Sequence, residues 1–261
     1  INFWSDFKGF SLIKRKTIDL FRIYALKNSD GIIFENIDLE RKCNEIYNVK
    51  GVTTTILPSI NLNYEEKKID LVIKNKQLKK GLFLCGWQKH KGVLKIPQIA
   101  FKLKQKNIKF NFILTAPQNQ CQIHKEFNSL IQKYNVSEYI SVIGNVSKKY
   151  IKSLYEQIDI VFLISKLESF SNNIIESWSY EKILMVSDEE WSKAICKDAA
   201  VYVNRNNTTE ISNKINEIVN NPNYYENIIS NGKKQLQKLN TIEEKNILEL
   251  NFLHLVFKNK Y

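Results

Sequence analysis

The sequence predicts an α/β fold built around a parallel sheet. Short runs of β-branched and other apolar residues alternate with amphipathic stretches of about 10–15 residues, which is the pattern of β-α-β units. Ile160–Ile164 contains no polar residue, as expected of a strand that is buried on both faces of a parallel sheet. The 261 residues include 43% hydrophobic and 11% aromatic residues, which is enough for a packed core. We therefore expect one large domain or two modest ones.

Residues 1–60 carry a short first series of elements, which we interpret as the C-terminal part of one Rossmann-like domain. The expected elements, in order, are a helix at Thr17–Lys27, a strand at Ile32–Glu35, a helix around Leu39–Tyr47 and a strand at Thr54–Leu57. Residues 61–79 are polar and irregular and run into the charged stretch Lys74–Lys80, so we expect an interdomain linker there. The chain opens on Ile1 without an initiator Met or a signal-peptide pattern, which leads us to expect that it begins inside a larger protein.

Residues 80–240 carry a longer series, which predicts a complete Rossmann-like domain with helices on both faces of its sheet. The expected strands are Leu82–Cys85, Phe110–Thr115, Ile140–Ile143, Ile160–Ile164, Ile183–Val186 and Ala200–Val203. The expected helices are Leu94–Lys106, Gln122–Tyr134, Lys148–Gln157, Asn172–Tyr180, Thr209–Asn220 and Tyr224–Leu239. Pro97 falls near the first turn of its helix, where a missing N–H costs least. Thr241–Glu244 fits a capping box, so residues 241–261 are predicted to form a last helix that returns to the first domain.

Charge and hydropathy exclude some classes of protein. No run of about 18 apolar residues occurs, so we expect no membrane-spanning helix. The net charge of +12 fits a polyanionic partner, either a nucleic acid, a phosphorylated substrate or an anionic lipid surface. Because the chain is also rich in Asn and Ile, we favour a compositional bias as the source of the total charge and expect no nucleic-acid partner.

Cysteine and histidine placement argues against a disulfide framework and against a metal site. The cysteines form no C-x-x-C pair and are expected to be reduced, buried thiols of a cytosolic protein. They are Cys43, Cys85, Cys121 and Cys196. The three histidines, none of them paired at helical spacing, are His90, His124 and His254. We therefore expect no bound metal.

The segment Glu168–Glu176 is the most informative one for function. It follows the expected central strand, and open α/β sheets bind ligands outside the carboxyl ends of their strands. Asn172 and Asn173 fall where a helix begins, so free N–H groups and the helix dipole favour an anion such as a diphosphate. Glu168 lies in the loop and Glu176 one turn inside the helix, so the two can reach opposite ends of an extended ligand. Carboxylates accept pairs of hydroxyl hydrogen bonds, which suits ribose at one end and a hexose at the other.

This segment resembles the E-x7-E signature of glycosyltransferase family four, whose members are retaining enzymes of the GT-B fold. The family form is E-[GS]-F-[GP]-[LN]-x-x-x-E, and Ser171 departs from it. The residues that match are Glu168, Ser169, Phe170, Asn172 and Glu176. The resemblance implies that Glu168 holds the hydroxyls of the donor sugar and that Glu176 holds the ribose diol. It also implies that the backbone of residues 170–172 meets the sugar and the phosphate.

Two further loops resemble those of the family. Gly86–Gly92 is similar to the first strand-to-helix loop, G-R-x(3–5)-K-G, in which Arg and Lys neutralise the leaving diphosphate. In this loop Gly86 is implied to bind the donor, and Lys91 matches the catalytic lysine. Trp87 occupies the arginine position, so Lys89 is the candidate for the second cation.

Gly144–Ser147 resembles the family's loop before the helix that ends in LY…AD. The corresponding residues here are Leu154, Tyr155, Ile158 and Asp159. In relatives the backbone of this loop holds the nucleobase, which implies that Asn145 and Val146 contact the base. The resemblance as a whole covers about residues 29–239.

The resemblance implies a hexosyltransferase that uses a nucleotide sugar such as a UDP- or GDP-sugar. The sugar would pass to a glycan or lipid-linked acceptor with retention of configuration, in bacterial cell-surface polysaccharide or glycolipid synthesis. Residues 1–60 would end the acceptor domain and residues 80–240 would form the donor-binding domain. On the family pattern most of the acceptor domain precedes Ile1, so we expect the 261 residues alone to be inactive. We expect no cofactor or metal, and no D-x-D-like motif lies near the site.

A cytoplasmic location is expected, with peripheral contact between the cationic surface and the anionic inner face of the plasma membrane as a further hypothesis. Two alternatives remain at this stage. A glycoside hydrolase could use Glu168 and Glu176 as its two carboxylates, but it would not need the Lys91 loop. A non-enzymatic nucleic-acid or membrane-binding module would explain the charge and should bind with a steep salt dependence. A dinucleotide dehydrogenase is disfavoured because no G-x-G-x-x-G follows any expected strand.

Overall fold

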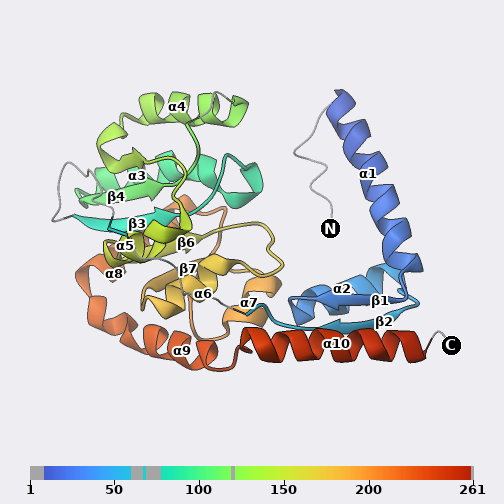
Figure 1. Ribbon diagram of the computed structural model, residues 1–261. Coiled ribbons are helices and arrows are strands. Elements are labelled where there is room, and N and C mark those ends of the chain that lie inside the picture. Colours follow the sequence, from blue (N-terminus) through green and yellow to red (C-terminus); the bar gives the residue numbers. More distant parts are fainter. Residues whose placement is uncertain (1–8, 60–66, 69–77, 119–120, 260–261) are drawn as a thin grey trace. The chain divides into compact units, whose positions relative to one another are not determined.

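The structure is a computed structural model that describes residues 9–59, 67–68, 78–118 and 121–259 (Figure 1). The chain divides into two compact units, one made of residues 1–60 and 239–261 and the other of residues 61–238. Most of the expected linker at 61–79 lies outside the described residues. Its last residue, Lys79, already belongs to the first strand of the larger unit.

The smaller unit contains two parallel strands and three helices among its described residues. These elements are α1 (Gly9–Asn28), β1 (Gly31–Phe34), α2 (Ile37–Tyr47), β2 (Val52–Thr55) and α10 (Ile242–Lys258). The strands pair in parallel, with Gly31 opposite Val52. β2 lies two residues earlier than the sequence predicts. The α2 helix also begins two residues earlier than predicted, at Ile37, because the side chain of Asn36 caps it and accepts a hydrogen bond from the Asp38 N–H at 2.8 Å.

The C-terminal helix α10 packs against β1 within the smaller unit. Its predicted capping box forms: the Glu244 N–H donates to Thr241 Oγ1 at 3.1 Å, and the Thr241 N–H donates to Glu244 Oε2 at 2.8 Å. Phe252 of this helix is buried. A Cβ at Gly31 would lie 2.5 Å from Val256 and 3.0 Å from Phe252, so a glycine is required where the helix crosses the strand.

The larger unit is a six-stranded parallel sheet in the order β5-β4-β3-β6-β7-β8. Its strands are β3 (Lys79–Phe83), β4 (Phe110–Leu114), β5 (Ile140–Val142), β6 (Ile160–Leu163), β7 (Ile183–Ser187) and β8 (Val201–Val203). Its α-helices are α3 (Ile96–Gln105), α4 (Gln122–Tyr134), α5 (Ile151–Glu156), α6 (Asn172–Ser179), α7 (Glu190–Cys196), α8 (Thr208–Asn220) and α9 (Glu226–Leu236). The predicted parallel α/β fold is confirmed.

Helices cover both faces of this sheet, because neighbouring strand residues point to opposite sides. Phe83 and Phe112 belong to one apolar core together with residues of α3, α4 and α8. Leu82 and Ile113 belong to a second core together with residues of α5, α6 and α7. The sheet is therefore buried on both sides, which explains the continuous apolar run of β6.

The order of the strands reverses between β3 and β6. From β3 the chain builds outward through β4 to β5, then returns to place β6 directly beside β3, with Gly81 opposite Ile160. At such a switch point the loops that leave the two strands diverge to opposite faces of the sheet and open a crevice at the carboxyl ends. The loops in question are residues 84–92 after β3 and residues 164–171 after β6.

Among the described residues, the sequence analysis missed one α-helix. The α7 helix is short, and its capping box is inverted: Glu189 is the N-cap, and Ser192 three residues later returns the hydrogen bond. The usual signature has Ser or Thr first and Glu second, so this start was not recognised. Cys43 and Cys196 are buried as expected, whereas Cys85 and Cys121 are partly exposed, and all four are free thiols. Among the described residues, no helix has the length and apolar character needed to cross a lipid bilayer.

Candidate functional site

The loop after β3 brings Lys91 to the switch point. It ends in a 3-10 turn at Lys89–Lys91, and the Lys91 ammonium lies 2.5 Å from Oε1 of Glu168 in the loop after β6. The side chains of Lys91 and Glu168 are only 22% and 11% exposed, so the ion pair is poorly screened by water. The two candidate catalytic residues therefore meet across β3 and β6, where an α/β sheet binds its ligand.

Gly92 fixes the turn that aims Lys91. Its φ of +80° lies in the left-handed region, and a Cβ there would lie 3.0 Å from the Ile164 carbonyl oxygen at the end of β6. Both features favour glycine. The backbone of the loop is also joined to the loop after β6 by a hydrogen bond of 2.8 Å from the Lys166 N–H to the His90 carbonyl.

Trp87 and Lys89 do not join the Lys91–Glu168 pair. Trp87 is buried, donates from Nε1 to the Pro117 carbonyl at 2.5 Å and stacks on His124 at a centroid distance of 4.5 Å. Lys89 is about half exposed and lies 3.6 Å from Glu126 on α4. The residue at the family's arginine position is thus part of the core, and Lys89 faces α4.

The loop after β6 continues directly into α6. Ser171 is the N-cap of this helix and Asn172 its first residue, both at or near the surface, while Ser169 is exposed and Phe170 packs partly against the second core. The N–H groups of the first helical turn have no intrahelical acceptor. Asn173 is buried and donates from Nδ2 to the Leu84 carbonyl at 3.1 Å, which ties the start of α6 to the loop after β3.

Glu176 lies inside α6, and its carboxylate accepts a hydrogen bond from Tyr155. The hydroxyl of this fully buried tyrosine donates to Glu176 Oε2 at 2.9 Å. Burial raises the pKa of Glu176 above its ordinary value, while the Tyr155 hydrogen bond and the nearby charge of Lys148 act in the opposite direction. Burial and the Glu176 charge likewise raise the pKa of Tyr155, so its hydroxyl stays a donor.

A cavity of about 260 Å³ opens at the carboxyl ends of β3, β4 and β5. Its lining residues are Leu84, Cys85, Gly86, Thr115, Asn145 and Val146. The structure thus brings Gly86 together with Asn145 and Val146, although they come from different loops. Cys85 belongs to the loop that carries Lys91, and burial raises the pKa of its thiol to about 12.

Sequence reasoning missed the contacts of three residues of this site: Lys148, Tyr155 and Asn173. Lys148 directly follows the loop assigned to the base, and its proximity to Glu176 could not be read from the spacing. Tyr155 was noted as part of a motif, but its bond to Glu176 joins positions 21 residues apart. Asn173 was counted as a helix start only, whereas its side chain links two loops.

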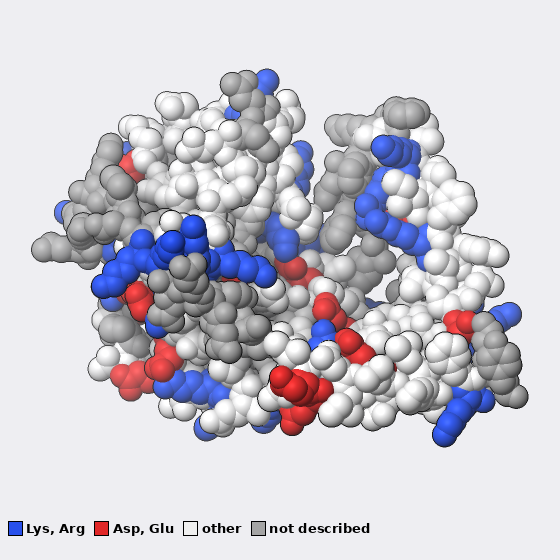
Figure 2. Space-filling model, viewed as in Figure 1, with Lys and Arg blue, Asp and Glu red and all other residues white. Residues whose placement is uncertain are grey.

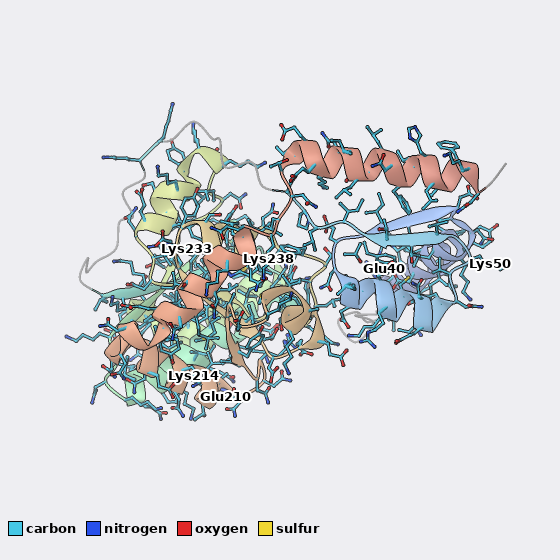
Figure 3. The ribbon with its side chains drawn as sticks, turned by 90° about the horizontal axis from the view of Figure 1, so that it is seen from below. Glu40, Lys50, Glu210, Lys214, Lys233 and Lys238 are labelled. Carbon is cyan, nitrogen blue, oxygen red and sulfur yellow. The ribbon has the colours of Figure 1, made fainter. Side chains whose placement is uncertain are left out.

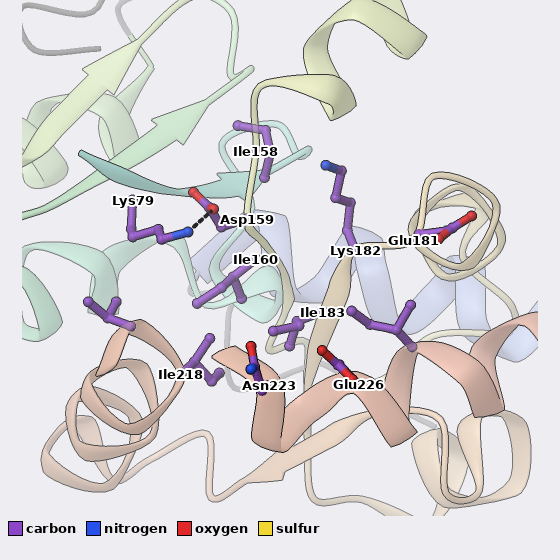
Figure 4. Close-up of a pocket in the computed structure, with 12 residues that line it drawn as sticks. Lys79, Ile158, Asp159, Ile160, Glu181, Lys182, Ile183, Ile218, Asn223 and Glu226 are labelled. Carbon is purple, nitrogen blue, oxygen red and sulfur yellow. Dashed lines mark hydrogen bonds and ion pairs between the residues drawn. The ribbon is translucent and has the colours of Figure 1, made fainter. Parts of the chain in front are cut away.

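A second cavity, of about 280 Å³, lies at the opposite edge of the same sheet (Figure 4). It is bounded by the amino ends of β3, β6 and β7, with Ile160, Ile183 and Ile218 on its apolar wall. Lys79 and Asp159 at its rim are paired at 2.9 Å. This is the edge at which open α/β sheets do not bind their ligands, so the candidate site is the one at the carboxyl ends. No group of three or more His, Cys, Asp or Glu residues suited to a metal occurs in the part of the chain that the structure describes.

Comparison with the models of known protein families identifies the family of this chain. The profile of the family described as "Glycosyl transferases group 1" matches residues 64–235, which is more than half of the chain. The chain belongs to this family. The matched region contains all the candidate site residues named above. A comparison with curated proteins finds no matching sequence.

Solved structures show the fold of the family. The chain is similar to a sucrose-phosphate synthase from Thermosynechococcus elongatus, with a TM-score of 0.80, 16% identity and coverage of 97% of this chain and 65% of that one. A glycosyltransferase from Rickettsia africae gives a TM-score of 0.75 at 15% identity, covering 92% of this chain and 68% of that one. A trehalose-phosphate synthase (UDP-forming) from Burkholderia vietnamiensis gives 0.78 at 10% identity, covering 98% and 66%.

The fold is therefore that of a GT-B glycosyltransferase, as the sequence predicted. The chain spans about two thirds of the length of each of these three proteins. The share is 65% for the sucrose-phosphate synthase.

Proposed function

We propose that the larger unit binds the nucleotide-sugar donor of a glycosyltransferase. The observation that carries this proposal is the Lys91–Glu168 ion pair at the switch point, next to the start of α6. A cation and a carboxylate side by side match a donor in which a diphosphate is joined to a sugar. Family membership supports the reaction class.

The roles follow from the position of each group. Lys91 and the N–H groups at the start of α6 face the diphosphate, because both attract negative charge. Glu168 accepts hydrogen bonds from the hydroxyls of the sugar next to that phosphate. Gly86, Asn145 and Val146 line the cavity that takes the nucleobase.

Glu176 is assigned to the ribose. Tyr155 occupies Oε2 of this carboxylate, which leaves Oε1 to accept a hydrogen bond from a ribose hydroxyl. Lys148 lies close enough to act electrostatically on Glu176, on the side where the chain leaves β5. The ligand thus extends from the β5 loop across the start of α6 to the Lys91 loop.

In the proposed reaction the bond between the anomeric carbon and the phosphate oxygen breaks, and its electron pair leaves with the nucleoside diphosphate. The acceptor hydroxyl oxygen bonds to the anomeric carbon with retention of configuration, and its proton passes to the departing diphosphate oxygen. Negative charge grows on the diphosphate, so each well-placed donor lowers the barrier by ~2.7–4 kcal/mol, by analogy with oxyanion holes. Lys91 and the N–H groups at the start of α6 are the donors that we assign to this role, and we propose no metal ion and no other cofactor.

For the acceptor we propose a glycan or a lipid-linked glycan, and for the location the cytoplasm with peripheral membrane contact. Figure 2 shows Lys and Arg side chains in a band across the surface near α5. The turn at Lys148–Tyr150 and α5 contribute three lysines to this region of the chain, at positions 148, 149 and 152. Such a band favours an anionic lipid surface. Liposome flotation with and without an anionic lipid tests this; equal binding to neutral vesicles would reject it.

The central test is calorimetric titration of the 261-residue chain with UDP and GDP, with Glu176→Ala as the matched variant. We expect one of the two nucleotides to bind and the variant to bind it at least tenfold more weakly, since a charged hydrogen bond contributes about 1.5–3 kcal/mol. We also expect no sugar transfer by this chain alone. Equal binding by both proteins would overturn the donor site. Hydrolysis of a nitrophenyl glycoside would favour a hydrolase instead.

A further inference from the structure

The loop after β8 reaches back to the two loops that carry the Lys91–Glu168 pair. Its Arg205 donates from Nη2 to the His90 carbonyl at 3.3 Å and from Nε to the Ile164 carbonyl at 3.4 Å. His90 directly precedes Lys91 in the loop after β3, and Ile164 opens the loop that leads to Glu168. One guanidinium therefore joins the backbones of both loops behind the ion pair.

The His90 carbonyl is the shared acceptor of this junction. It receives the Lys166 N–H at 2.8 Å from the loop after β6 as well as Arg205 from the loop after β8. A planar guanidinium presents its donors in a fixed fork, so it sets the separation of the two carbonyls it binds. A lysine at this position would offer a single ammonium without that fork.

The loop that carries Arg205 is itself well held. The Asn204 N–H donates to Glu210 Oε1 at 2.9 Å, and the Glu210 N–H donates to Asn207 Oδ1 at 3.0 Å, which together cap α8. The neighbouring Asn206 accepts a hydrogen bond of 2.7 Å from Lys95, just beyond the Lys91 turn. The backbone on both sides of Arg205 is therefore held in place by hydrogen bonds.

We propose that Arg205 is a positioning residue that sets the distance between Lys91 and Glu168 and so prepares the diphosphate-binding end of the donor site. The proposal rests on the function proposed above. The pair spans two loops whose direct backbone link is the Lys166–His90 hydrogen bond, and an ion pair at 2.5 Å is sensitive to displacement of either loop. Arg205 does not contact the donor itself and acts through Lys91.

A double-mutant cycle in the 261-residue chain tests this, with Arg205→Ala, Lys91→Ala and the double variant. Calorimetry measures the affinity for the preferred nucleoside diphosphate and for the matching nucleoside. We expect Arg205→Ala to weaken diphosphate binding about tenfold while nucleoside binding is unchanged, as is typical of coupled neighbours. In the Lys91→Ala background the same change should have no further effect. A purely structural role would lower both affinities.

Lys214→Ala is the matched control, because Lys214 is a cation on α8 (Figure 3). It pairs with Glu217 on the same helix. If Arg205→Ala fails to fold by circular dichroism, Arg205→Lys takes its place in the cycle, with the same expected direction. Additive losses, or no loss from either Arg205 variant, would overturn the inference. If Lys91→Ala and Glu176→Ala also leave diphosphate binding intact, the proposed function fails as well, so the two failures are distinguishable.

Discussion

The Lys91 ammonium and the Glu168 carboxylate lie 2.5 Å apart although 77 residues separate them in the chain. They meet because β3 and β6 are adjacent in the sheet and both loops leave at its carboxyl edge. Each charge neutralises the other, and both side chains are largely shielded from water. A bound diphosphate would take over part of this role for Lys91, and sugar hydroxyls would do so for Glu168.

Replacing Lys91 by Ala should weaken nucleoside diphosphate binding by about 10- to 100-fold, because a charged hydrogen bond contributes about 1.5–3 kcal/mol. The matched control is Lys89→Ala, which removes the same charge from the same loop. Lys89 pairs with Glu126 at 3.6 Å in an exposed position, so we expect its loss to matter little. Calorimetry compares the two. Equal losses would mean that loop charge in general, not Lys91, holds the diphosphate.

Replacing Glu176 by Gln should raise the Tm of the ligand-free chain at neutral pH while it weakens nucleotide binding. The pKa of Glu176 is raised in the folded state, so its ionisation opposes folding once the pH exceeds its ordinary value of 4.5. The stability that the protonated form contributes is present below that pH and is lost as the pH rises through the raised pKa. Gln keeps an acceptor for Tyr155 without the charge.

Thermal unfolding checks the expected rise in Tm for Glu176→Gln, and calorimetry on the same samples checks the expected loss of nucleotide affinity. Nucleotide binding by the unmodified chain should also decline on acidification sooner than an ordinary glutamate would allow, since the protonated form accepts fewer hydrogen bonds. Glu138→Gln is the control, because its side chain is 69% exposed. A Glu176→Gln variant with lower Tm than the unmodified chain would contradict the expectation.

Tyr155→Phe should raise the pH at which nucleotide binding is half lost on acidification. Loss of the hydroxyl removes the hydrogen bond of 2.9 Å that favours ionised Glu176, so the pKa of that carboxyl rises further. At neutral pH we expect a loss of about tenfold in affinity, in line with about 1.5 kcal/mol for a hydrogen bond to a charged group. Tyr139→Phe, next to β5, provides the matched removal of a hydroxyl and should leave the pH profile in place.

Gly92→Ala should destabilise the larger unit by about 1–2 kcal/mol, because a side chain is strained in the left-handed region. The added Cβ would also lie 3.0 Å from the Ile164 carbonyl. Gly86→Ala is the stability control, since nothing lies within 4 Å of a Cβ at that position. Urea unfolding of both variants gives the comparison. An unchanged midpoint for Gly92→Ala would show that the turn relaxes without cost.

Trp87→Arg, which restores the family's residue, should destabilise the chain without improving diphosphate binding. Trp87 is buried against His124 and Phe127, and truncation of such a side chain costs about 3–5 kcal/mol. Burial of the new charge adds to that loss. Trp87→Phe should be milder. Tighter diphosphate binding by the Arg variant would show that the loop can turn this position toward the site.

The sequence predicted most elements of the larger unit because their signals are local. The apolar run of β6 and the amphipathic period of α4 are visible without any partner, and both elements lie where expected. The α7 helix was missed because its capping pair is inverted. β2 was placed two residues late because the apolar pair Ile56-Leu57 follows its three threonines, so the end of the strand has no clear sequence signal.

Some residues of the candidate site could likewise be predicted from the sequence, and others could not. Glu168 and the start of α6 stood out because strand-to-helix loops of an α/β sheet have a known place for ligands, and Lys91 stood out because its loop resembles one of the family. The role of Trp87 could not be predicted, because a loop tryptophan gives no indication of the side to which it turns. Arg205 gave no signal at all, since its hydrogen bonds are to backbone carbonyls 41 and 115 residues away.

The sequence by itself determined the fold class, the succession of strands and helices, and the loops in which the chemistry should be sought. Hydrophobic periodicity and helix capping involve residues that are close in sequence, so they can be recognised from the sequence alone. Only the tertiary structure decided that Lys91 faces Glu168, that Tyr155 holds Glu176 and that Arg205 joins two loops. Those pairings depend on the order of strands in the sheet, and that order is set by the burial of two cores at once rather than by any local pattern.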